Sequence, residues 1–377
     1  MRDITFIHCG DIHLDARFTS TGMNDEQAKN RRQELRDAFS AIIDKAISYG
    51  VHMLFICGDL FEHEYMSRST ALFILQQLSR IPDVKVFISP GNHDPYVANS
   101  YYATLRWPDN VHIFKGTVEG VHIKELDTTV YGTGFINKQQ YRSMLEGLNG
   151  IKKDGINILV THGTVDGGQD DCPYHPINSQ YLKALDFDYI ALGHIHKHCK
   201  LDEERDSPKI LYCGSPEPLG FDEPGEHGII LGSIGQKGTK TKFIPIGRRK
   251  CITVEIDVSG IVSMEEAEGL LKQKLEIMKE HLVRVIFTGR KNKDLEIDTV
   301  LMLARNRHHC YHLMLIDRTC PDIHLDDLKN QCNLKGIFVR NMLQEIEQTE
   351  DANKKEILLK ALYMGLEAMD GRIPTAV

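Results

Sequence analysis

The sequence predicts a sandwich of two β-sheets covered by helices, followed by a smaller α+β domain with a helical tail. Strands and helices alternate early in the chain and give way to a β-rich stretch, a pattern typical of packed sheets with helices outside. Beyond residue 247 short strands alternate with helices again. A length of 377 residues also favours one large and one smaller domain. We therefore predict domains at residues 1–247 and 248–377.

Short apolar runs predict the strands of the first domain, and longer amphipathic runs predict its helices. A helix is expected over residues 31–49, where Leu35, Phe39 and Ile42 recur at helical spacing and Gly50 ends the pattern. A second helix is expected at 69–78. The expected strands are 5–8, 53–57, 84–88, 121–124, 130–132, 156–161 and 189–192, followed by a β-rich stretch at 210–213, 228–231, 241–246 and 253–258 that runs past the predicted boundary at residue 247.

The second domain is expected to contain helices at 264–279 and 298–304, strands at 283–287 and 312–316, and two terminal helices. The terminal helices carry apolar stripes at helical spacing. Their members are Ile337, Phe338, Met342, Ile346, Ile357, Leu358, Ala361, Leu362 and Leu366. These stripes either pack onto the small domain or dock a partner.

Composition excludes several classes of protein. No run approaches the roughly 20 apolar residues of a membrane helix. The N-terminal residues lack the apolar core of a signal peptide, so the expected location is the cytoplasm. Nine cysteines without C-x-x-C spacing indicate reduced thiols rather than a disulfide framework or a zinc ribbon.

The charge is acidic and unevenly distributed. Residues 248–377 hold 20 Lys and Arg against 21 Asp and Glu, so residues 1–247 carry −7 of the formal net charge of −8. This balance disfavours a general nucleic-acid-binding protein, which would usually be basic. An acidic first domain suits a metal site, where cations offset carboxylates, although acidic surfaces are usually only solvated.

Five short polar motifs each follow a predicted strand of the first domain. They are Asp11-Ile12-His13, Gly58-Asp59, Gly91-Asn92-His93-Asp94, His162-Gly163 and Gly193-His194-Ile195-His196. Ligands of open α/β sheets bind at the carboxyl ends of the strands, so these motifs are expected to meet. One such triplet is usually a coincidence, but the five together indicate a site.

The side chains of these motifs are those of a metal centre. Carboxylate oxygens and imidazole nitrogens suit Mn²⁺, Fe²⁺ or Zn²⁺, and the absence of thiolates disfavours structural zinc. Seven or eight ligands exceed the needs of one ion, so we expect two divalent ions sharing a carboxylate, with Mn²⁺ as the first choice. Two ions about 3.5–4 Å apart activate a water and stabilise the attacking and leaving oxygens of a phosphoryl group.

The ordered motif set resembles the signature of calcineurin-like metallophosphoesterases over residues 1 to about 215. The longer segments Asp11-Ile12-His13-Leu14-Asp15, Gly58-Asp59-Leu60-Phe61 and Gly214-Ser215-Pro216 resemble SbcD-like DNA exonucleases, including the bacterial YhaO branch. The resemblance implies a four-layer α/β/β/α sandwich with a C-terminal α+β capping domain. It also implies a phosphodiesterase that acts as an exonuclease or endonuclease in DNA repair.

The same resemblance assigns roles residue by residue. One ion is held by Asp11, His13, Asp59 and His196, and the other by Asp59, Asn92, His162 and His194, with Asp59 bridging. His93 is placed beside the scissile phosphate as general acid or transition-state stabiliser. Asp94 either orients a nearby histidine or caps a turn.

One position departs from the nuclease pattern. Glu62 follows Gly-Asp-Leu-Phe where relatives have His or Asp, which leaves the leaving-group chemistry open. The neighbouring His63 either contacts phosphate instead or is a polar loop residue.

The substrate and the partners are less defined by the sequence than the reaction. DNA backbone contacts are expected from Arg248, Arg249, Lys250, Arg290, Lys291 and Lys293, unless these clusters are ordinary solvated surface; Arg305, Arg307, His308 and His309 form a further basic group. The alternatives to a DNA nuclease are a small-molecule phosphodiesterase or phosphatase and a non-catalytic regulatory subunit. The resemblance implies a coiled-coil ATPase partner of the SbcC type and a homodimer.

Overall fold

The chain divides into two compact units, Met1–Lys250 and Cys251–Val377. The computed structural model describes residues 3–19, 22–145, 148, 155–167, 174–185, 187–204, 207–292, 295–322 and 325–371. The division follows Lys250, so the basic segment 248–250, which the sequence assigned to the second domain, belongs to the first unit. In the described ranges, no helix has the length and apolarity that a bilayer crossing demands.

The first unit contains two six-stranded sheets. The first sheet has the order β14-β13-β1-β2-β3-β4, in which β1 to β4 run parallel and β13 and β14 are antiparallel. Its strands are β1 (Ile4–Cys9), β2 (Met53–Ile56), β3 (Lys85–Ile88), β4 (Val111–Ile113), β13 (Gly228–Gly235) and β14 (Gly238–Pro245).

The second sheet has the order β11-β12-β10-β7-β6-β5, with antiparallel edges around a parallel centre. Its strands are β5 (Gly116–Ile123), β6 (Thr128–Gly134), β7 (Ile156–His162), β10 (Tyr189–Gly193), β11 (Cys199–Lys200) and β12 (Ile210–Tyr212). Two short strands, β8 (Thr164–Val165) and β9 (Pro176–Ile177), pair separately, and a 3₁₀ turn spans Lys124–Leu126.

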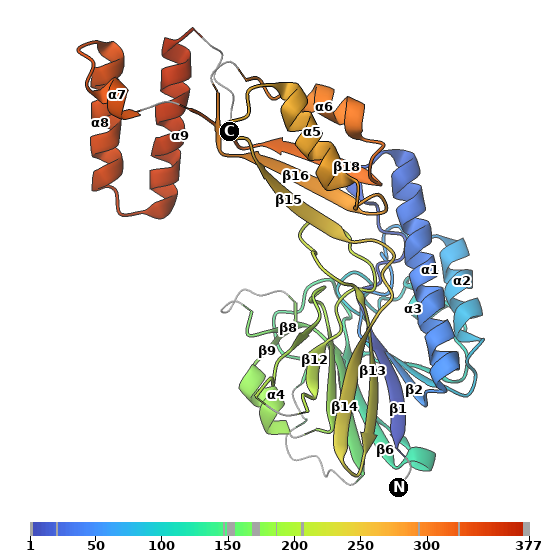
Figure 1. Cartoon of the computed structure of the whole chain (residues 1–377). Helices are drawn as coiled ribbons and strands as arrows, with labels where there is room; N and C mark the ends of the chain where they lie inside the picture. The colour runs from blue at the N-terminus through green and yellow to red at the C-terminus, as the bar shows by residue number, and fades with distance from the viewer. Residues whose placement is uncertain are drawn as a thin grey trace. The chain divides into compact units, whose positions relative to one another are not determined.

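Alternation along the strands builds the layers. Phe6 and Phe55 point into the core between the two sheets, whereas Ile7 and Leu54 point to the opposite face. That outer face packs against α1 (Asp25–Tyr49) and α2 (Arg68–Leu78), and the second sheet packs against α4 (Ser179–Leu185). Figure 1 shows these helices on opposite sides of the sheets. The predicted α/β/β/α sandwich is therefore confirmed; α3 (Tyr101–Thr104) is a single turn beside it.

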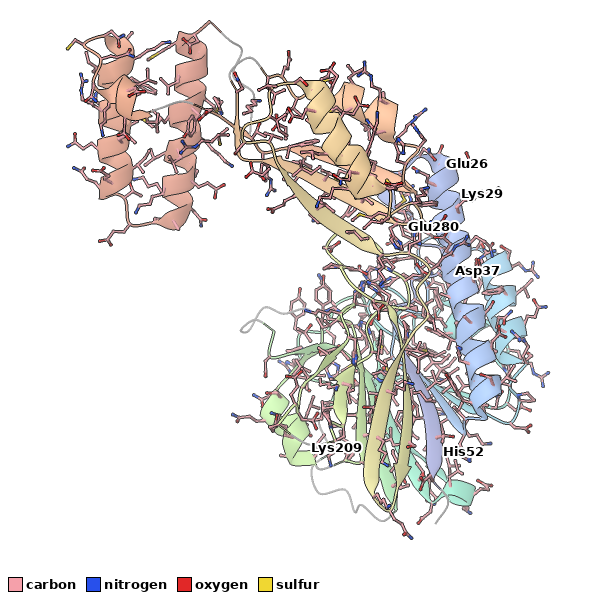
Figure 2. All side chains as sticks on the ribbon, viewed as in Figure 1. Glu26, Lys29, Asp37, His52, Lys209 and Glu280 are labelled. Carbon is pink, nitrogen blue, oxygen red and sulfur yellow. The ribbon has the colours of Figure 1, made fainter. Side chains whose placement is uncertain are left out.

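Helix α1 begins at Asp25, six residues before the predicted start. Asn24 and Gln27 form a capping box, each side chain bonding the other residue's backbone N–H. The first buried turns contain the charged residues Arg31 and Glu34, which an apolar pattern does not detect. Glu26, Lys29 and Asp37 lie on the exposed face of the helix (Figure 2).

The buried charges of α1 form an ionic network. Arg31 pairs with Glu34 and, at 3.0 Å, with Glu217, while Arg249 reaches Glu34 at 2.7 Å. All four side chains are at most 6% exposed. The prediction that Arg249 contacts DNA is therefore wrong, because its guanidinium is buried against α1.

Removing Arg31 leaves the buried Glu217 without its cation and leaves Glu34 with Arg249 as its buried partner. We expect Arg31→Ala to lower the free energy of unfolding by about 3–5 kcal/mol. Urea unfolding followed by fluorescence of Trp107, the only tryptophan and a residue of the first unit, measures this. The control Arg80→Ala removes an exposed pair with Asp44 and should cost under about 1 kcal/mol. Equal losses in both variants would contradict the expectation.

The second unit is built on a parallel three-stranded sheet of β15 (Cys251–Asp257), β16 (Leu282–Thr288) and β18 (His312–Asp317). Helices α5 (Met264–Leu275) and α6 (Thr299–Asn306) follow β15 and β16. The apolar faces of both helices pack against this sheet and form one core with it. Short strands β17 (Arg290–Lys291) and β19 (Cys320–Pro321) pair beyond the sheet. The remaining helices are α7 (Leu325–Lys329), α8 (Leu334–Gln348) and α9 (Ala352–Met369).

The apolar stripes of α8 and α9 face each other in part. Val339, Leu362 and Leu366 are buried in a small core that α7, α8 and α9 form among themselves, separate from the core of the three-stranded sheet, so the expected packing onto the small domain is not what this cluster shows. Ile337 and Ile357 are 49% and 65% exposed and stay uncovered within the described chain.

Candidate metal centre

All five motifs lie at the carboxyl ends of parallel strands. β1, β2 and β3 of the first sheet are followed by the motifs that begin at Asp11, Gly58 and Gly91. β7 ends at His162, and β10 is followed by His194 in the second sheet. The motifs therefore come from both sheets and meet at one end of the sandwich.

The structure brings together all seven side chains that the sequence singled out as metal ligands. Asp11, His13 and His196 form one cluster whose ligand atoms lie within 4.8 Å of one another, and Asp59, His162 and His194 form another. Asn92 joins the second cluster, because its Oδ1 lies 3.1 Å from His162 Nε2. Each cluster has the size of a site for one cation.

Asp59 lies between the two clusters. Its Oδ2 is 3.7 Å from His13 Nε2 on one side and 3.4 Å from His162 Nε2 on the other. Its Oδ1 accepts the backbone N–H of His93 at 2.9 Å, which fixes the orientation of the carboxylate. This is the geometry that a bridging carboxylate needs.

The backbone at the site is strained. Asp11, His13, Asp59 and His194 all have positive φ, which is uncommon for residues with a side chain and is concentrated at functional sites. Gly58 makes room for the site, because a Cβ there would lie 2.3 Å from His162 Nδ1. The fold thus places the clusters at a conformational cost.

Hydrogen bonds aim three imidazoles into the centre. His13 Nδ1 bonds Glu62 at 2.8 Å, His196 Nδ1 bonds Glu223 at 2.7 Å, and His162 Nδ1 bonds the Cys57 carbonyl at 2.8 Å. These partners assign the proton to Nδ1 and leave Nε2 as the coordinating atom.

The arrangement fits divalent cations. Nε2 of His13 and Nε2 of His196 lie 3.2 Å apart, so two lone pairs converge unless a cation or a proton lies between them. Burial opposes protonation, but the bond to Glu223 raises the pKa of His196 to about 9, so a cation that binds Nε2 of this ring has to displace a proton from it. Burial lowers the pKa of His194 to about 3, which keeps that ring neutral and ready to coordinate. None of the described clusters contains a cysteine, so the site lacks the thiolate ligands of a structural zinc site.

Glu62, the residue that departs from the expected nuclease pattern, connects the metal cluster to His93. Its second oxygen lies 2.9 Å from His93 Nδ1, while its first holds His13. The Glu62 hydrogen bond raises the pKa of His93 to about 9, so His93 is protonated at neutral pH. His93 stacks edge-on against His13 with ring centroids 4.8 Å apart, which places an acid directly beside the cation clusters.

Of the two roles expected for Asp94, orienting a histidine or capping a turn, its hydrogen bonds fit the second. The buried carboxylate accepts the backbone N–H groups of Asp59, Leu60 and Gly91 and the hydroxyl of Tyr102. Burial and the charge of Asp59 raise the pKa of Asp94 to about 6. Asp94 therefore holds the Gly-Asp and Gly-Asn-His-Asp loops together.

His63 is partly buried, and its backbone N–H donates to the His93 carbonyl at 3.0 Å. Its Nδ1 is buried with no hydrogen-bond partner in the described chain. The contact holds the two loops in register.

The basic residues proposed to contact DNA are dispersed. Arg248 and Lys250 are exposed on the first unit, and Lys250 pairs with Glu226 at 3.1 Å. Arg290 and Lys291 line a groove of about 840 Å³ in the second unit, together with Arg318 and Lys360. Lys293 lies outside the described residues.

Glu223 is the site residue that the sequence did not reveal. It belongs to the loop that follows Gly214-Ser215-Pro216, outside the five polar motifs, and a glutamate in such a loop has no distinguishing pattern. The general tendency of coordinating histidines to bond a carboxylate through the other nitrogen predicts that such a partner exists, but not which residue it is.

A strand-end centre with two adjoining clusters of carboxylates and imidazoles is typical of enzymes that use two divalent metals, phosphatases and nucleases among them. The chain belongs to the calcineurin-like phosphoesterases, whose family model matches residues 4–198. All the clustered residues lie inside this match.

Relatives extend the similarity beyond the first unit. The chain is 31% identical over 244 residues to a Bacillus subtilis (strain 168) protein described as an uncharacterized metallophosphoesterase, YhaO; the match covers 61% of this chain and 57% of that protein. It is 26% identical over 335 residues to the DNA double-strand break repair protein Mre11 of Saccharolobus solfataricus, and this match covers 85% of this chain and 84% of that protein. The DNA double-strand break repair protein Mre11 of Methanopyrus kandleri is 23% identical, and this match covers 77% of this chain and 66% of that protein. The chain thus spans less than two thirds of the length of the YhaO and Methanopyrus proteins.

The link between Glu62 and His93 has a consequence for pH dependence. Glu62→Gln removes the main cause of the raised pKa of His93, so the ring loses its proton at a lower pH than in the unaltered protein. We expect the alkaline fall of kcat to move to lower pH. The measurement is kcat against pH at saturating metal, with a phosphodiester whose alkoxide leaving group needs a proton.

The matched control is Glu64→Gln, an exposed neighbour that pairs with Lys138 instead of His93. Its pH profile should remain that of the unaltered protein. An unchanged alkaline limb in Glu62→Gln would show that His93 does not act as the acid.

Proposed function

We propose that this protein is a metal-dependent phosphodiesterase that cleaves DNA, with an exonuclease or endonuclease role in DNA repair. The observation that carries the proposal is Asp59, placed between two cation-sized clusters with the protonated His93 alongside. In this proposal one ion takes Asp11, His13, Asp59 and His196, and the other takes Asp59, Asn92, His162 and His194.

The chain's own residues divide the work. When bound, the ions supply a nucleophile at neutral pH and stabilise charge on the phosphoryl oxygens. Glu62 keeps the proton of His93 Nδ1 in place and holds the ring toward the clusters. The imidazolium then presents its Nε2–H to the leaving oxygen, which departs protonated. Asp94 keeps the loop of His93 and the loop of Asp59 at a fixed separation.

The DNA substrate is supported by two observations. The matched proteins of Methanopyrus and Saccharolobus are both described as DNA double-strand break repair proteins. The Saccharolobus match covers 85% of this chain, so it extends into the second unit. The second unit also has the groove lined by four cations, Arg290, Lys291, Arg318 and Lys360. Glu356 lines it too and pairs with Lys360, so the groove keeps a net positive charge that suits a phosphate backbone. Mn²⁺ is the proposed ion, with Fe²⁺ and Zn²⁺ as alternatives.

The second unit is proposed to cap the site and to dock a partner. The resemblance to SbcD-like nucleases implies a coiled-coil ATPase of the SbcC type and a homodimer. Ile337 of α8 and Ile357 of α9 are exposed and are the candidate apolar contacts for such an ATPase. A small-molecule phosphodiesterase is the second candidate, favoured by the completeness of the metal site within the first unit alone. A purely regulatory subunit is disfavoured by the same completeness.

The proposal is tested by incubating the purified chain with Mn²⁺ and end-labelled single- or double-stranded DNA. We expect metal-dependent cleavage that Asp59→Ala abolishes, because the change removes a ligand from both clusters. His93→Gln should retain bound metal and lower kcat by roughly 10²–10⁴-fold, the usual contribution of a general acid.

Asp44→Ala, an exposed change on α1, is the control and should cleave like the unaltered protein. Cleavage of a chromogenic phosphodiester without cleavage of DNA would favour the small-molecule alternative. Bound metal without activity on either substrate would favour the regulatory one.

A further inference from the structure

A second groove, of about 530 Å³, opens directly from the candidate metal centre. Its volume lies in the range of roughly 300–1,000 Å³ that is typical of ligand pockets. His194 and His196 form one end, and the segment 222–227 forms one side. The mechanism proposed above uses these two histidines and leaves the rest of the groove without a role.

Two stacked aromatic rings line this groove. His198 and Phe243 lie with centroids 4.9 Å apart and ring planes within 17° of parallel. His198 Nδ1 bonds the Tyr212 carbonyl at 2.9 Å, which fixes the imidazole ring. A Cβ at Gly228 would lie 2.2 Å from the Ile244 carbonyl oxygen and 2.9 Å from the tip of the Phe243 ring, so a side chain there would displace both. Both rings are partly exposed, so they form an aromatic surface that a further ring can join.

The facing side of the groove is fastened to the metal centre. Glu223 bonds His196 through one oxygen, and through the other it accepts the Ser215 hydroxyl and the Leu219 N–H, each at 3.1 Å. The buried His227 bonds Ser215 at 2.9 Å and the Glu223 carbonyl at 3.0 Å. A ligand in the groove would therefore be held at a constant position relative to the cation clusters.

The charges around the groove do not suit phosphate. Three carboxylates line the groove, those of Asp222, Glu223 and Glu226. Lys197 is the one lysine or arginine among the described lining residues. Lining of this kind disfavours a nucleic-acid backbone and favours a neutral planar group with N–H donors at its edge. A nucleobase has this chemistry, and every base can stack on an aromatic side chain.

We infer that this groove is a base-stacking subsite, in which Phe243 and His198 hold the nucleobase next to the scissile phosphate. The inference rests on the proposed nuclease function and names the feature that separates nucleic acid from simple phosphodiesters at this centre. Phe243 determines specificity through KM and kcat/KM and takes no part in the bond that breaks.

The test is a double comparison of substrate and side chain. One substrate is an oligodeoxyadenylate of about ten nucleotides, whose bases carry exocyclic N–H donors, and the other is a tetrahydrofuran oligomer with the same phosphodiester backbone and no bases. We expect the unaltered protein with Mn²⁺ to cleave the first with a kcat/KM about tenfold higher, the size of effect that one base-stacking contact gives.

Phe243→Leu keeps apolar volume but removes the aromatic face, so it should cleave both oligomers at the lower rate. Phe243→Trp should restore the preference for bases. Tyr49→Leu removes an exposed aromatic ring outside the groove and should behave as the unaltered protein. Unchanged thermal midpoints and bound metal would confirm that each variant is folded.

The outcomes separate the two claims. If the unaltered protein cleaves both oligomers equally, or if Phe243→Leu keeps the full preference, the subsite is refuted and the nuclease function stands. If it cleaves neither oligomer, the nuclease function itself fails, and the subsite fails with it.

Discussion

The position of one buried carboxylate constrains the rest of the first unit. Asp59 is 2% exposed, and it must face histidines from both sheets while its own backbone is strained. A buried carboxylate surrounded by imidazoles is stable only when charge is balanced locally. The flanking histidines lower the pKa of Asp59 despite its burial, so the carboxylate remains ionised and attracts cations. The sandwich, the capped loops around Asp94 and the strained turns all serve to hold this charge where two strand ends meet.

Much of the site could be predicted because its polar residues occur in short sequence motifs that directly follow strands. The residues from Asp11 to His196 have types and positions that a metal centre requires, and parallel strands bring their ends to one edge. His93 was identifiable for the same reason. The pKa of His93 was not, because it depends on a hydrogen bond to Glu62 that only the folded loops create.

The failures share a physical cause, which is polar chemistry inside the fold. The apolar pattern of α1 starts late because its first buried face is made of Arg31 and Glu34. Arg249 resembles any surface cation in the sequence, yet it is buried against that helix. Glu223 is a loop glutamate until the chain folds and brings it to His196. Hydrophobic periodicity carries no information on such pairs, because each depends on residues distant in the sequence.

The ionic network of α1 also fixes the last residues of the first unit. Arg249 is bound to Glu34, and the backbone of Arg248 donates to Glu217, so the chain is anchored up to that point. The segment that ends the first unit is therefore fastened to a helix residue 215 positions earlier in the sequence. Loss of the Arg249 charge would release this segment from α1, while every proposed ligand of the metal centre stayed in place.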